Sequence, residues 1–495
     1  MSRHLTVFVA LALLSVLLVS SWQIAQSDET AATTRQNEFE GWQKPEVALL
    51  ITGRQHGYIE PCGCTGLANQ KGGMARRHSL LKQLKAKGWD VVPLDVGNQV
   101  RRFGAQAAAK FLSTVDGLRE MEYGAVAFGP DDLRLTLGDL IAAVASQTGE
   151  SDLFICANAN PAGFVEGFRV IEAGGMRIGV AAVLGTEQLA RVTQEDIFKS
   201  APMESLKDTM VQMKAANCDF QVLLSHASID ESSLFAKAFP QLDLVVTAGG
   251  AGEPTFKPQE IAGAKAVMIQ AGTKGMYAGV VGIYKQGEDR LKYQRIPLDD
   301  RFEDSTEMLD ILAAYQDKLK QQGLAGLGLS PVAHPSGRKY VGSESCGDCH
   351  VQAYEKWLET PHAHATDSIS QPTERADIPR HHDPECISCH VTGWDPQRYI
   401  PYDSGYLDLE KSALLHGNGC ENCHGPGAGH AAAEAEGATV TDEVKMQLRD
   451  LMKLPLSKAR DKCMTCHDLD NSPDFHEDGA FEDIYWPEVE HYGKD

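Results

Sequence analysis

The sequence predicts two structured parts of different fold class: a layered α/β domain over residues 45–300 and a mainly α-helical domain over residues 341–495. Three observations support this division. Short β-rich runs alternate with helical stretches in the first part, a Gly- and Pro-rich stretch follows it, and the β pattern disappears beyond that stretch. With 495 residues, the chain is also too long for one compact hydrophobic core, so more than one domain is expected.

The strands and helices of the first part follow from its apolar runs. Strands are expected at Val47–Thr52, Val91–Val96, Ala125–Phe128, Leu153–Ala157, Arg177–Val183, Phe220–Ser225, Leu242–Thr247, Ala266–Gln270 and Ala278–Tyr284. Helices are expected at Gly73–Lys87, Ala105–Glu120, Leu137–Ser146, Met203–Ala216 and Ser232–Phe239. Strands separated by helices of about ten to fifteen residues are typical of βα units that pack as layers.

Residues 301–340 are predicted to connect the two parts. Within Ser305–Gln322, apolar side chains recur at helical spacing, which indicates an amphipathic helix. The segments Gly323–Pro331 and Pro335–Gly337 are rich in Gly and Pro, which indicates a linker.

Residues 1–26 are expected to be a signal peptide or an N-terminal anchor. Arg3 and His4 precede an apolar run that ends at the small residues Ser20 and Ser21, as in a secretory signal. The run is short for a membrane span, so cleavage and retention as an anchor both stay open. No other segment approaches membrane length, and any membrane attachment is therefore expected only through this segment.

Eight of the twelve cysteines occur in four copies of the pattern Cys-x-x-Cys-His. The cysteine pairs are Cys346 and Cys349, Cys386 and Cys389, Cys420 and Cys423, and Cys463 and Cys466. The histidines that follow them are His350, His390, His424 and His467. In this pattern two thiols add to the vinyl groups of one porphyrin, and the adjacent imidazole is the proximal iron ligand. Zinc fingers and thioredoxin-like sites have different spacings and contexts, so the motifs predict four covalently bound haem c groups.

A second ligand on the distal side of any of these irons must come from the other histidines of the second part. The available side chains are His362, His364, His381, His382, His416, His430, His476 and His491. An iron with two histidine ligands is a reversible electron carrier, whereas an open sixth position makes it a binding or reaction site. Because covalent haem attachment in bacteria takes place outside the cytoplasmic membrane, a periplasmic or otherwise exported location is expected.

The net charge of −22 argues against a nucleic-acid-binding protein, which needs a basic face. Residues 341–495 hold 12 of the 46 basic side chains but 30 of the 68 acidic ones. The run from Asp468 to Glu490 contains nine acidic residues and no Lys or Arg. A basic redox partner protein is the favoured hypothesis for this surface, and a merely solubilising surface is the alternative.

The segment from Ser343 to Tyr492 resembles the tetrahaem cytochromes c typified by the electron acceptor of hydroxylamine oxidoreductase. Besides the four motifs, the resemblance rests on Trp357–Ala363, on Gly419–Gly427 with His430, and on Cys463–Pro473. It implies a mainly α-helical fold with closely packed haem pairs, a function in electron transfer, and one haem that can lack a second protein ligand. It also favours His362, His430 and His491 as the distal ligands.

The segment from Val47 to Leu298 resembles the calcineurin-like metallophosphatase domain of periplasmic 5′-nucleotidases. The matching stretches are Thr52–Gly57, Asp95–Asn98, Phe128–Asp132, Leu224–His226 and Asp243–Ala251. That family binds two metal ions, but only His56 and His226 stand at its ligand positions here. At the other ligand positions, Arg54 replaces an Asp, Asn98 replaces the bridging Asp, and Pro130 replaces an Asn. Asp131 replaces the catalytic His, and Gly249 and Ala251 replace the two histidines of the last motif.

A two-metal hydrolase needs anionic and imidazole ligands to hold its cations and to generate hydroxide, so this domain is predicted to be an inactive scaffold. His56, Cys62, Cys64 and His226 form a possible residual site for a single metal ion. Free thiols or disulfides, with Cys156 or Cys218 as partners, are the alternative. Arg76 and Arg77 are expected to be solvated rather than phosphate-binding.

The predicted fold class is thus a layered, metallophosphatase-like α/β domain followed by a mainly α, haem-packed multihaem cytochrome c domain. An electron-transfer cytochrome fused to an inactive metallophosphatase-like domain is the favoured function. A haem enzyme that acts on a small nitrogen or sulfur species at an open iron is the first alternative. A nucleotidase-like hydrolase fused to a cytochrome is the second.

Overall fold

The structure is a computed structural model that describes residues 38–61, 70–102, 104–144, 153–285, 290–372 and 377–491. The predicted signal peptide or anchor at residues 1–26 and the thiols Cys62 and Cys64 lie outside these residues. The chain divides into two units, Met1–Pro45 and Glu46–Asp495, and the second contains both predicted domains. Across the described ranges, we find no helix with the length and apolar character that a membrane span requires.

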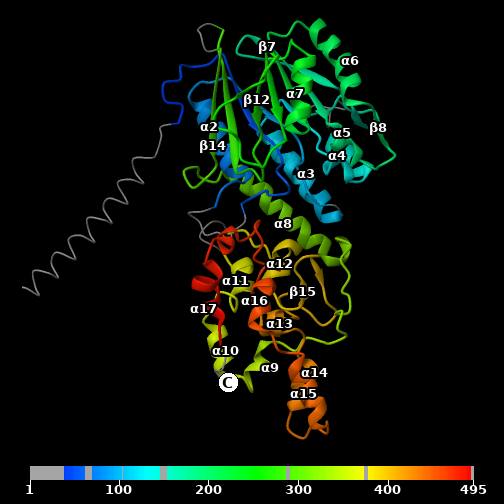
Figure 1. The fold of residues 1–495 in the computed structure, drawn as a ribbon, viewed down its shortest axis with the longest axis vertical. Coiled ribbons are helices and arrows are strands. Elements are labelled where there is room, and N and C mark those ends of the chain that lie inside the picture. The colour runs from blue at the N-terminus through cyan, green and yellow to red at the C-terminus, as the bar shows by residue number, and fades with distance from the viewer. Residues whose placement is uncertain are drawn as a thin grey trace, which may run out of the picture. The chain divides into compact units, whose positions relative to one another are not determined.

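Two six-stranded sheets are formed by described residues of the first part (Figure 1). The first sheet has the order β14 (Leu291–Pro297), β13 (Tyr277–Ile283), β1 (Val47–Thr52), β2 (Val91–Asp95), β3 (Ala125–Ala127) and β4 (Phe154–Ile155). The second has the order β11 (Gln259–Glu260), β12 (Val267–Gln270), β10 (Leu244–Thr247), β9 (Phe220–His226), β7 (Met176–Leu184) and β6 (Phe168–Ala173). Strands β1 to β4 are parallel to one another, as are β7, β9, β10 and β12, so each group directs its carboxyl ends toward one edge.

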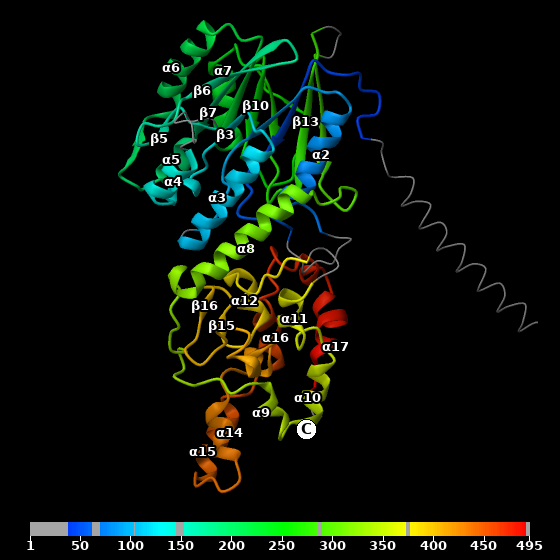
Figure 2. The ribbon, with the colours of Figure 1, turned by 180° about the vertical axis from the view of Figure 1, so that it is seen from behind.

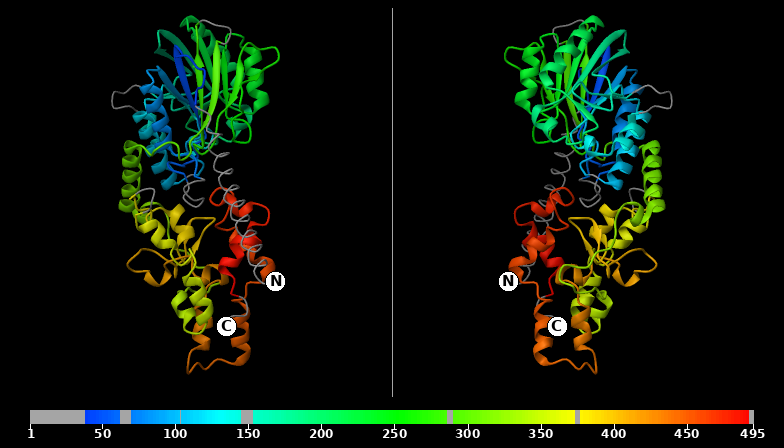
Figure 3. Two further views of the ribbon diagram at one scale, coloured as in Figure 1. Left: turned by 90° about the vertical axis from the view of Figure 1, so that its left-hand side faces the viewer. Right: turned by 90° about the vertical axis from the view of Figure 1, so that its right-hand side faces the viewer.

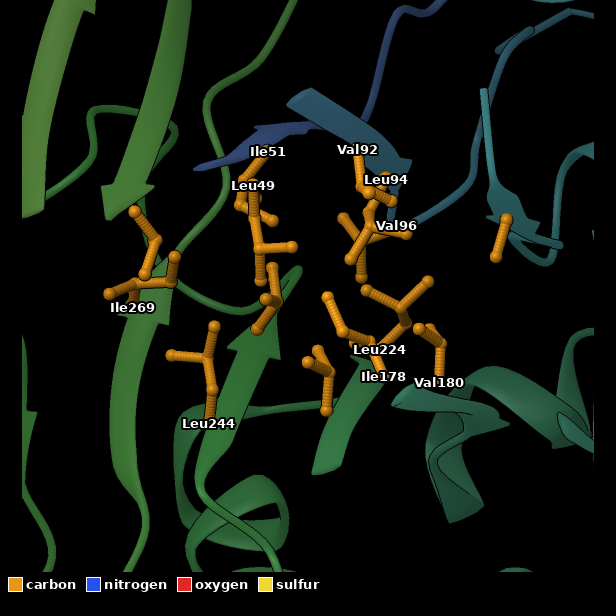
Figure 4. Close-up of a cluster of buried hydrophobic side chains, with 14 of the residues drawn as sticks. Leu49, Ile51, Val92, Leu94, Val96, Ile178, Val180, Leu224, Leu244 and Ile269 are labelled. Carbon is orange, nitrogen blue, oxygen red and sulfur yellow. The ribbon is translucent and has the colours of Figure 1, made fainter. Parts of the chain in front are cut away.

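The main hydrophobic core lies between the two sheets (Figure 4). Alternate side chains of each strand point into it, as expected for sheets packed face to face. Leu49, Ile51, Val92, Leu94 and Val96 from the first sheet meet Ile178, Val180, Leu224, Leu244 and Ile269 from the second. The near-continuous apolar sequence of β1 is explained by its central position, because it is buried on both faces.

Helices cover the outer faces of both sheets (Figures 2 and 3). On the second sheet, α6 (Pro202–Ala215) and α7 (Ile229–Ala238) bury a hydrophobic cluster against β7, β9 and β10. On the first sheet, α2 (Met74–Ala86) contacts β2, and α8 (Thr306–Gly326) packs on α2 and α3 (Ala105–Glu120). The shorter elements α4 (Leu137–Val144), α5 (Thr186–Ala190), β5 (Ala159–Pro161) and β8 (Ile197–Lys199) lie in the connections.

The second part is mainly helical, and its helices are short. They are α9 (Ser343–Gly347), α10 (Val351–Leu358), α11 (Ala365–Ser370), α12 (Pro384–His390), α13 (Cys420–His424), α14 (Ala428–Glu434), α15 (Asp442–Asp450), α16 (Leu456–Cys463) and α17 (Trp486–Val489). Strands β15 (Trp394–Asp395) and β16 (Ile400–Pro401) form a small hairpin. The buried apolar clusters of the second part are much smaller than the core of the first part. The predicted fold class, a layered α/β part followed by a mainly α part, is confirmed.

Several details differ from the sequence analysis, and the short elements α5, β5, β8 and β11 were among those not predicted. The edge strands β6 and β14 were not predicted, because charged residues interrupt their apolar pattern. Helix α8 extends to Gly326 but is kinked at Gly323, whose non-helical backbone with φ of 57° is allowed for glycine without steric cost. The expectation that Arg76 and Arg77 are solvated was wrong, since both are buried. The guanidinium of Arg77 bonds to Gln55 and, at 3.2 Å, to the hydroxyl of Tyr123, and this fixes the loop after β1.

Helix α12, which carries the second Cys-x-x-Cys-His motif, is attached to the α/β part by buried charges. The ammonium of Lys110 on α3 donates to the Glu385 carboxylate at 2.5 Å. The Gln106 amide and the Tyr315 hydroxyl donate to Asp383 at 2.6 and 3.2 Å. Burial disfavours both carboxylates, and it raises the pKa of Asp383. For Glu385, Lys110 and Arg102 outweigh burial and lower the pKa.

Candidate functional site

A pocket of about 430 Å³ opens at the carboxyl ends of the parallel strands of both sheets. This is where α/β folds place their binding sites. Its lining residues are Arg54, His56, Asn98, Arg101, Asp131, Gln188, Arg191, His226, Ala248, Ala251, Thr273 and Lys274. The positions that the nucleotidase resemblance singled out, Arg54, His56, Asn98, Asp131, His226 and Ala251, therefore lie together. Pro130 and Gly249 do not line the pocket.

Arg54 is held in the pocket by backbone carbonyls. Its guanidinium donates to the carbonyl oxygens of Ala271 at 2.7 Å, Gly250 at 3.1 Å and Gly272 at 3.4 Å. No carboxylate among the described residues forms an ion pair with it. Burial lowers the pKa of this guanidinium, which is the effect expected when a cation is removed from water without an opposing charge.

Asn98 and Asp131 form a closed hydrogen-bonded pair. The Asn98 amide donates to one Asp131 carboxylate oxygen at 2.8 Å, and the Asp131 backbone amide donates to the Asn98 side-chain oxygen at 3.0 Å. The other carboxylate oxygen accepts from Arg191 at 2.6 Å. The side chains that replace the bridging Asp and the catalytic His therefore satisfy each other's hydrogen bonds.

The two histidines of the pocket are neutral at pH 7. Burial, with Arg54 and Arg101 nearby, lowers the pKa of His56 to about 4. Burial also lowers the pKa of His226 to about 4. The ring of His226 donates through Nδ1 to the Val96 carbonyl at 2.8 Å, so its Nε2 carries the lone pair.

The pocket does not fit the two metal ions that the fold family implies. In the ranges that the structure describes, no three His, Cys, Asp or Glu side chains come together as a metal site would require. Three arginines and a lysine stand where dications would need anionic ligands. Of the four residues in the predicted single-metal site, the structure describes only His56 and His226. Cys156 and Cys218 are free thiols and form no disulfide with another described residue. The site with Cys62 and Cys64 stays a prediction.

The four Cys-x-x-Cys-His motifs lie on or beside short helical segments of the second part. In the first and fourth, the backbone amide of the histidine donates to the carbonyl of the first cysteine, for example from His350 to Cys346 at 2.9 Å. Such a turn brings residues i, i+3 and i+4 to one face, so both thiols and the imidazole can reach the same porphyrin.

The motifs lie close to one another in a definite order. The side chains of Cys346 and Cys420 interact directly, which joins the first motif to the third. Cys389 and Cys466 do the same for the second and the fourth. Cys423 has Cys463 and Cys466 as electrostatic neighbours, which places the third motif beside the fourth.

Three of the motif histidines face another histidine. Ring centroids are 6.4 Å apart for His350 and His430, 6.0 Å for His467 and His362, and 5.8 Å for His424 and His491. Two imidazoles on opposite sides of one metal, with metal–nitrogen bonds of about 2 Å, have centroids roughly 6 Å apart. The three pairs include each distal residue that the cytochrome resemblance favoured.

Hydrogen bonds through Nδ1 distinguish His424, His491 and the second-motif histidine His390 from several other histidines of the second part. Nδ1 of His424 donates to the Met452 carbonyl at 2.7 Å, and Nδ1 of His491 and of His390 donates to a carbonyl at 2.9 Å. Nε2 of each ring therefore remains available for an iron. His364, His416 and His476 instead bond to backbone carbonyls through Nε2, and the rings of His381 and His382 pack on each other.

His390 of the second motif differs from the other three. Within the described part of the chain, no histidine ring packs against it. Its Nδ1 lies 2.9 Å from the carbonyl oxygen of Ala365 and 3.1 Å from the hydroxyl of Ser368. Three motifs thus have a facing imidazole and one does not.

Residues 345–425 match the family model for cytochrome c554 and c-prime. Cytochrome c-554 of Nitrosomonas europaea is 26% identical over 144 residues, which are 26% of this chain and 57% of that protein. A snake venom 5′-nucleotidase of Crotalus adamanteus is 22% identical over 281 residues, 48% of this chain and 45% of that protein. The chain spans about half the length of the curated relatives it matches.

Among solved structures, the 5′-nucleotidase precursor of Thermus thermophilus is similar, with a TM-score of 0.47 and 17% identity. The match covers 66% of this chain and 68% of that chain. The second part thus resembles cytochrome c554, and the first resembles 5′-nucleotidases of the metallophosphatase type. Both resemblances predicted from the sequence are confirmed, and the match to cytochrome c554 implies covalently bound haem c.

Five polar residues of the nucleotidase-like pocket belong to no family motif and were not predicted from the sequence: Arg101, Gln188, Arg191, Thr273 and Lys274. Each follows the carboxyl end of a strand or lies in the connection after it, and that position was the available signal.

Proposed function

We propose that this chain is a four-haem c-type cytochrome that transfers electrons and carries an inactive metallophosphatase-like domain. The observation that supports it best is the spacing of the three histidine pairs, which suits an iron with two imidazole ligands. When bound, each haem c supplies an iron that exchanges one electron.

In this proposal, the distal ligand of each haem that has one comes from a segment that follows another haem's motif and not its own. The first haem is bound by Cys346 and Cys349 with His350 and His430, and the third by Cys420 and Cys423 with His424 and His491. The fourth is bound by Cys463 and Cys466 with His467 and His362. The second is bound by Cys386 and Cys389 with His390 and has no histidine on its other side.

The motif contacts give the electrons a path. The first motif lies beside the third, the third beside the fourth, and the fourth beside the second. Electrons would therefore pass between the haems in the order one, three, four, two, or in reverse.

Mass spectrometry and EPR of the purified protein test this assignment. We expect a mass that exceeds the chain by four haem groups, with three low-spin irons and one high-spin iron. His362→Ala should convert one low-spin iron to high-spin, whereas His364→Ala, at an exposed ring bonded to a backbone carbonyl, should change nothing. Four low-spin irons, or equal effects of the two variants, would contradict the assignment.

The unpaired His390 supports a second candidate, a haem enzyme that acts on a small nitrogen or sulfur species. An iron without a distal side chain binds exogenous ligands. Carbon monoxide should bind one reduced iron in either case. Turnover of hydroxylamine, nitric oxide or sulfide would favour the enzyme, and ligand binding without turnover would favour the carrier.

We propose that the α/β part does not hydrolyse phosphate esters. The support is that Arg54 replaces an Asp ligand, Asn98 replaces the bridging Asp, and Asp131, which is hydrogen-bonded to Asn98, replaces the catalytic His. No nucleotidase activity is expected with added manganese or zinc. Metal-dependent turnover that disappears in His226→Ala would show instead that the domain is a hydrolase.

We also propose that a basic redox partner docks on the acidic tail, residues 468–490. Glu477, Asp478, Glu482 and Asp483 are exposed, and none forms an ion pair with another described residue. Asp470 points elsewhere, because it pairs with Arg101 and Lys274 of the α/β part. Complementary charge raises the rates of small, transient electron-transfer encounters.

The rate of reduction should then fall as ionic strength rises from about 0.01 to 0.15 M, over which the Debye length shrinks from roughly 30 to 8 Å. Neutralising the four exposed tail carboxylates should flatten this dependence. Neutralising Glu436, Asp442, Glu443 and Asp450, which are equally exposed, should not. Equal salt dependence in all three proteins would remove the tail as the docking surface.

An exported location is proposed on the same grounds as before: covalent haem attachment and the apolar N-terminal segment. N-terminal sequencing of the mature protein tests it. A new N-terminus within residues 20–30 would show cleavage, an intact Met1 in the membrane fraction would show an anchor, and an intact Met1 in the cytosol would contradict export.

A further inference from the structure

The pocket of the α/β part contains more positive than negative charge. Four cations line it, Arg54, Arg101, Arg191 and Lys274, together with one carboxylate, Asp131. A second carboxylate, Asp470 of the haem part, pairs with Arg101 at 2.9 Å and also with Lys274. The lining side chains and Asp470 together therefore carry four cations and two carboxylates, an excess of two positive charges.

The guanidinium of Arg54 is the centre of this excess. Arginine has five N–H donors, and three hydrogen bonds of Arg54 go to backbone carbonyls. A half-buried cation that is bonded only to neutral oxygens is costly unless an anion completes its environment. Planar guanidinium groups are well suited to bind the oxygens of phosphate-like anions.

The backbone around the pocket is also held in an unusual conformation. Arg54, His56, Asn98 and Lys274 are non-glycine residues with φ between 49° and 64°. Backbone hydrogen bonds fix these conformations, among them one from the amide of Lys274 to the carbonyl of Arg54 at 2.8 Å. Such strained conformations concentrate at functional sites.

We propose that this pocket binds a small divalent oxyanion, such as inorganic phosphate or sulfate, directly through its arginine and lysine side chains and without metal ions. The anion supplies the two missing negative charges, and the volume of about 430 Å³ admits it with water. Because Asp470 already bonds to two of the four cations, the anion competes with this carboxylate of the haem part. Anion binding in the α/β part is thereby coupled to the segment that follows the fourth haem motif.

Isothermal titration calorimetry of the full-length, haem-loaded protein with sodium phosphate and with sodium sulfate tests the proposal, at constant ionic strength maintained with chloride. We expect saturable binding of one anion, retained after treatment with EDTA. Arg191→Gln should weaken it about tenfold, because one charge-assisted hydrogen bond is lost. Arg177→Gln is the matched control, since the two arginine side chains are 46% and 47% exposed and Arg177 lies outside the pocket.

The combination Arg101→Gln with Arg191→Gln should abolish binding, and both side chains are exposed enough for the variant to fold. Binding that is equal in wild type and in both variants would overturn the proposal. So would the absence of saturable binding, or binding that EDTA removes and zinc restores.

The competition with Asp470 has a test of its own. Asp470→Asn should tighten anion binding several-fold, because Arg101 and Lys274 lose their carboxylate partner. Asp408→Asn, which removes a similarly exposed carboxylate paired with Lys411, should leave the affinity unchanged. An unchanged affinity in Asp470→Asn would show that the anion binds without displacing the haem part and would overturn the coupling.

Discussion

The α/β part and the haem part differ in which residues stabilise the fold and which residues carry the family motifs. In the α/β part, apolar strands such as β1 are fully buried between two sheets, while the motif positions of the family have changed. In the haem part, the buried apolar clusters are small, while the motif cysteines and histidines are complete in the sequence. A fold whose core is formed by side chains can therefore persist when the residues at its motif positions change. Where the cofactor replaces that core, fold and chemistry must be kept together.

Removing one haem attachment site should have the largest effect, because it should unfold one part of the chain and leave the other folded. Cys420→Ser combined with Cys423→Ser removes both attachment thiols of the proposed third haem, which lie between the first and fourth motifs. We expect residues 341–491 to lose their cooperative folding and the α/β part to keep its own, as measured by limited proteolysis and circular dichroism. Cys218→Ser, at a half-buried thiol outside the motifs, is the control. Protection of the haem part in the double variant would contradict the comparison.

A substitution in the core of the α/β part should destabilise that part and leave the haem part unchanged. Leu49→Ala in β1 removes a fully buried side chain from between the sheets. Since large-to-small changes in a core leave a cavity, we expect the α/β part to lose about 4 kcal/mol of unfolding free energy in urea. The haem absorption spectrum should not change. A spectral shift at low urea would mean that the two parts share one core.

The contact between the two parts should be sensitive to one buried cation. Lys110→Met leaves Glu385 and Asp383 beside each other with less compensating charge, which should cost about 3 kcal/mol. The unfolding transitions of the two parts should move further apart in calorimetry. Lys82→Met removes an exposed ion pair with Glu307 and should cost less than about 0.5 kcal/mol. Equal effects of the two variants would show that the buried pair does not hold the parts together.

The smallest effect concerns pH. Burial lowers the pKa of His226 to about 4 in the folded α/β part, below the ordinary value of 6.5. The unfolded chain therefore binds this proton more readily, so stability is complete above about pH 6.5 and falls as the pH drops toward 4. His226→Asn should reduce that loss by roughly 2 kcal/mol, measured by urea unfolding at pH 7 and pH 4.5. His364→Asn, at an exposed ring, is the control, and an unchanged slope in His226→Asn would show that another group titrates.

Periodicity and spacing were sufficient to predict the central elements and the haem motifs. Strand β1 and helix α3 have the predicted bounds, because an uninterrupted apolar run and a helical stripe depend on local sequence. The edge strands β6 and β14 could not be predicted in this way, since partners across the sheet, and not their own pattern, make them strands.

The two sites differ in the same respect. The proximal histidines are adjacent to their cysteines in sequence, so the spacing alone identifies them. The facing histidines and the basic side chains of the pocket come from distant segments. Nothing near Arg191 or Lys274 in the sequence indicates Arg54 as a neighbour, and only the meeting of strand ends brings the three together.

The order of the strands along the chain also fixes an order of assembly. Strand β1 pairs with β13, for example Leu50 with Val280, so the first sheet closes only after more than half of the polypeptide is available. Pairing over such a separation is slow. The strands are nevertheless complete at Pro297, before Cys346 opens the first motif. During synthesis the N-terminal part can therefore fold first and present α3 and α8 as a template for the segment around Asp383.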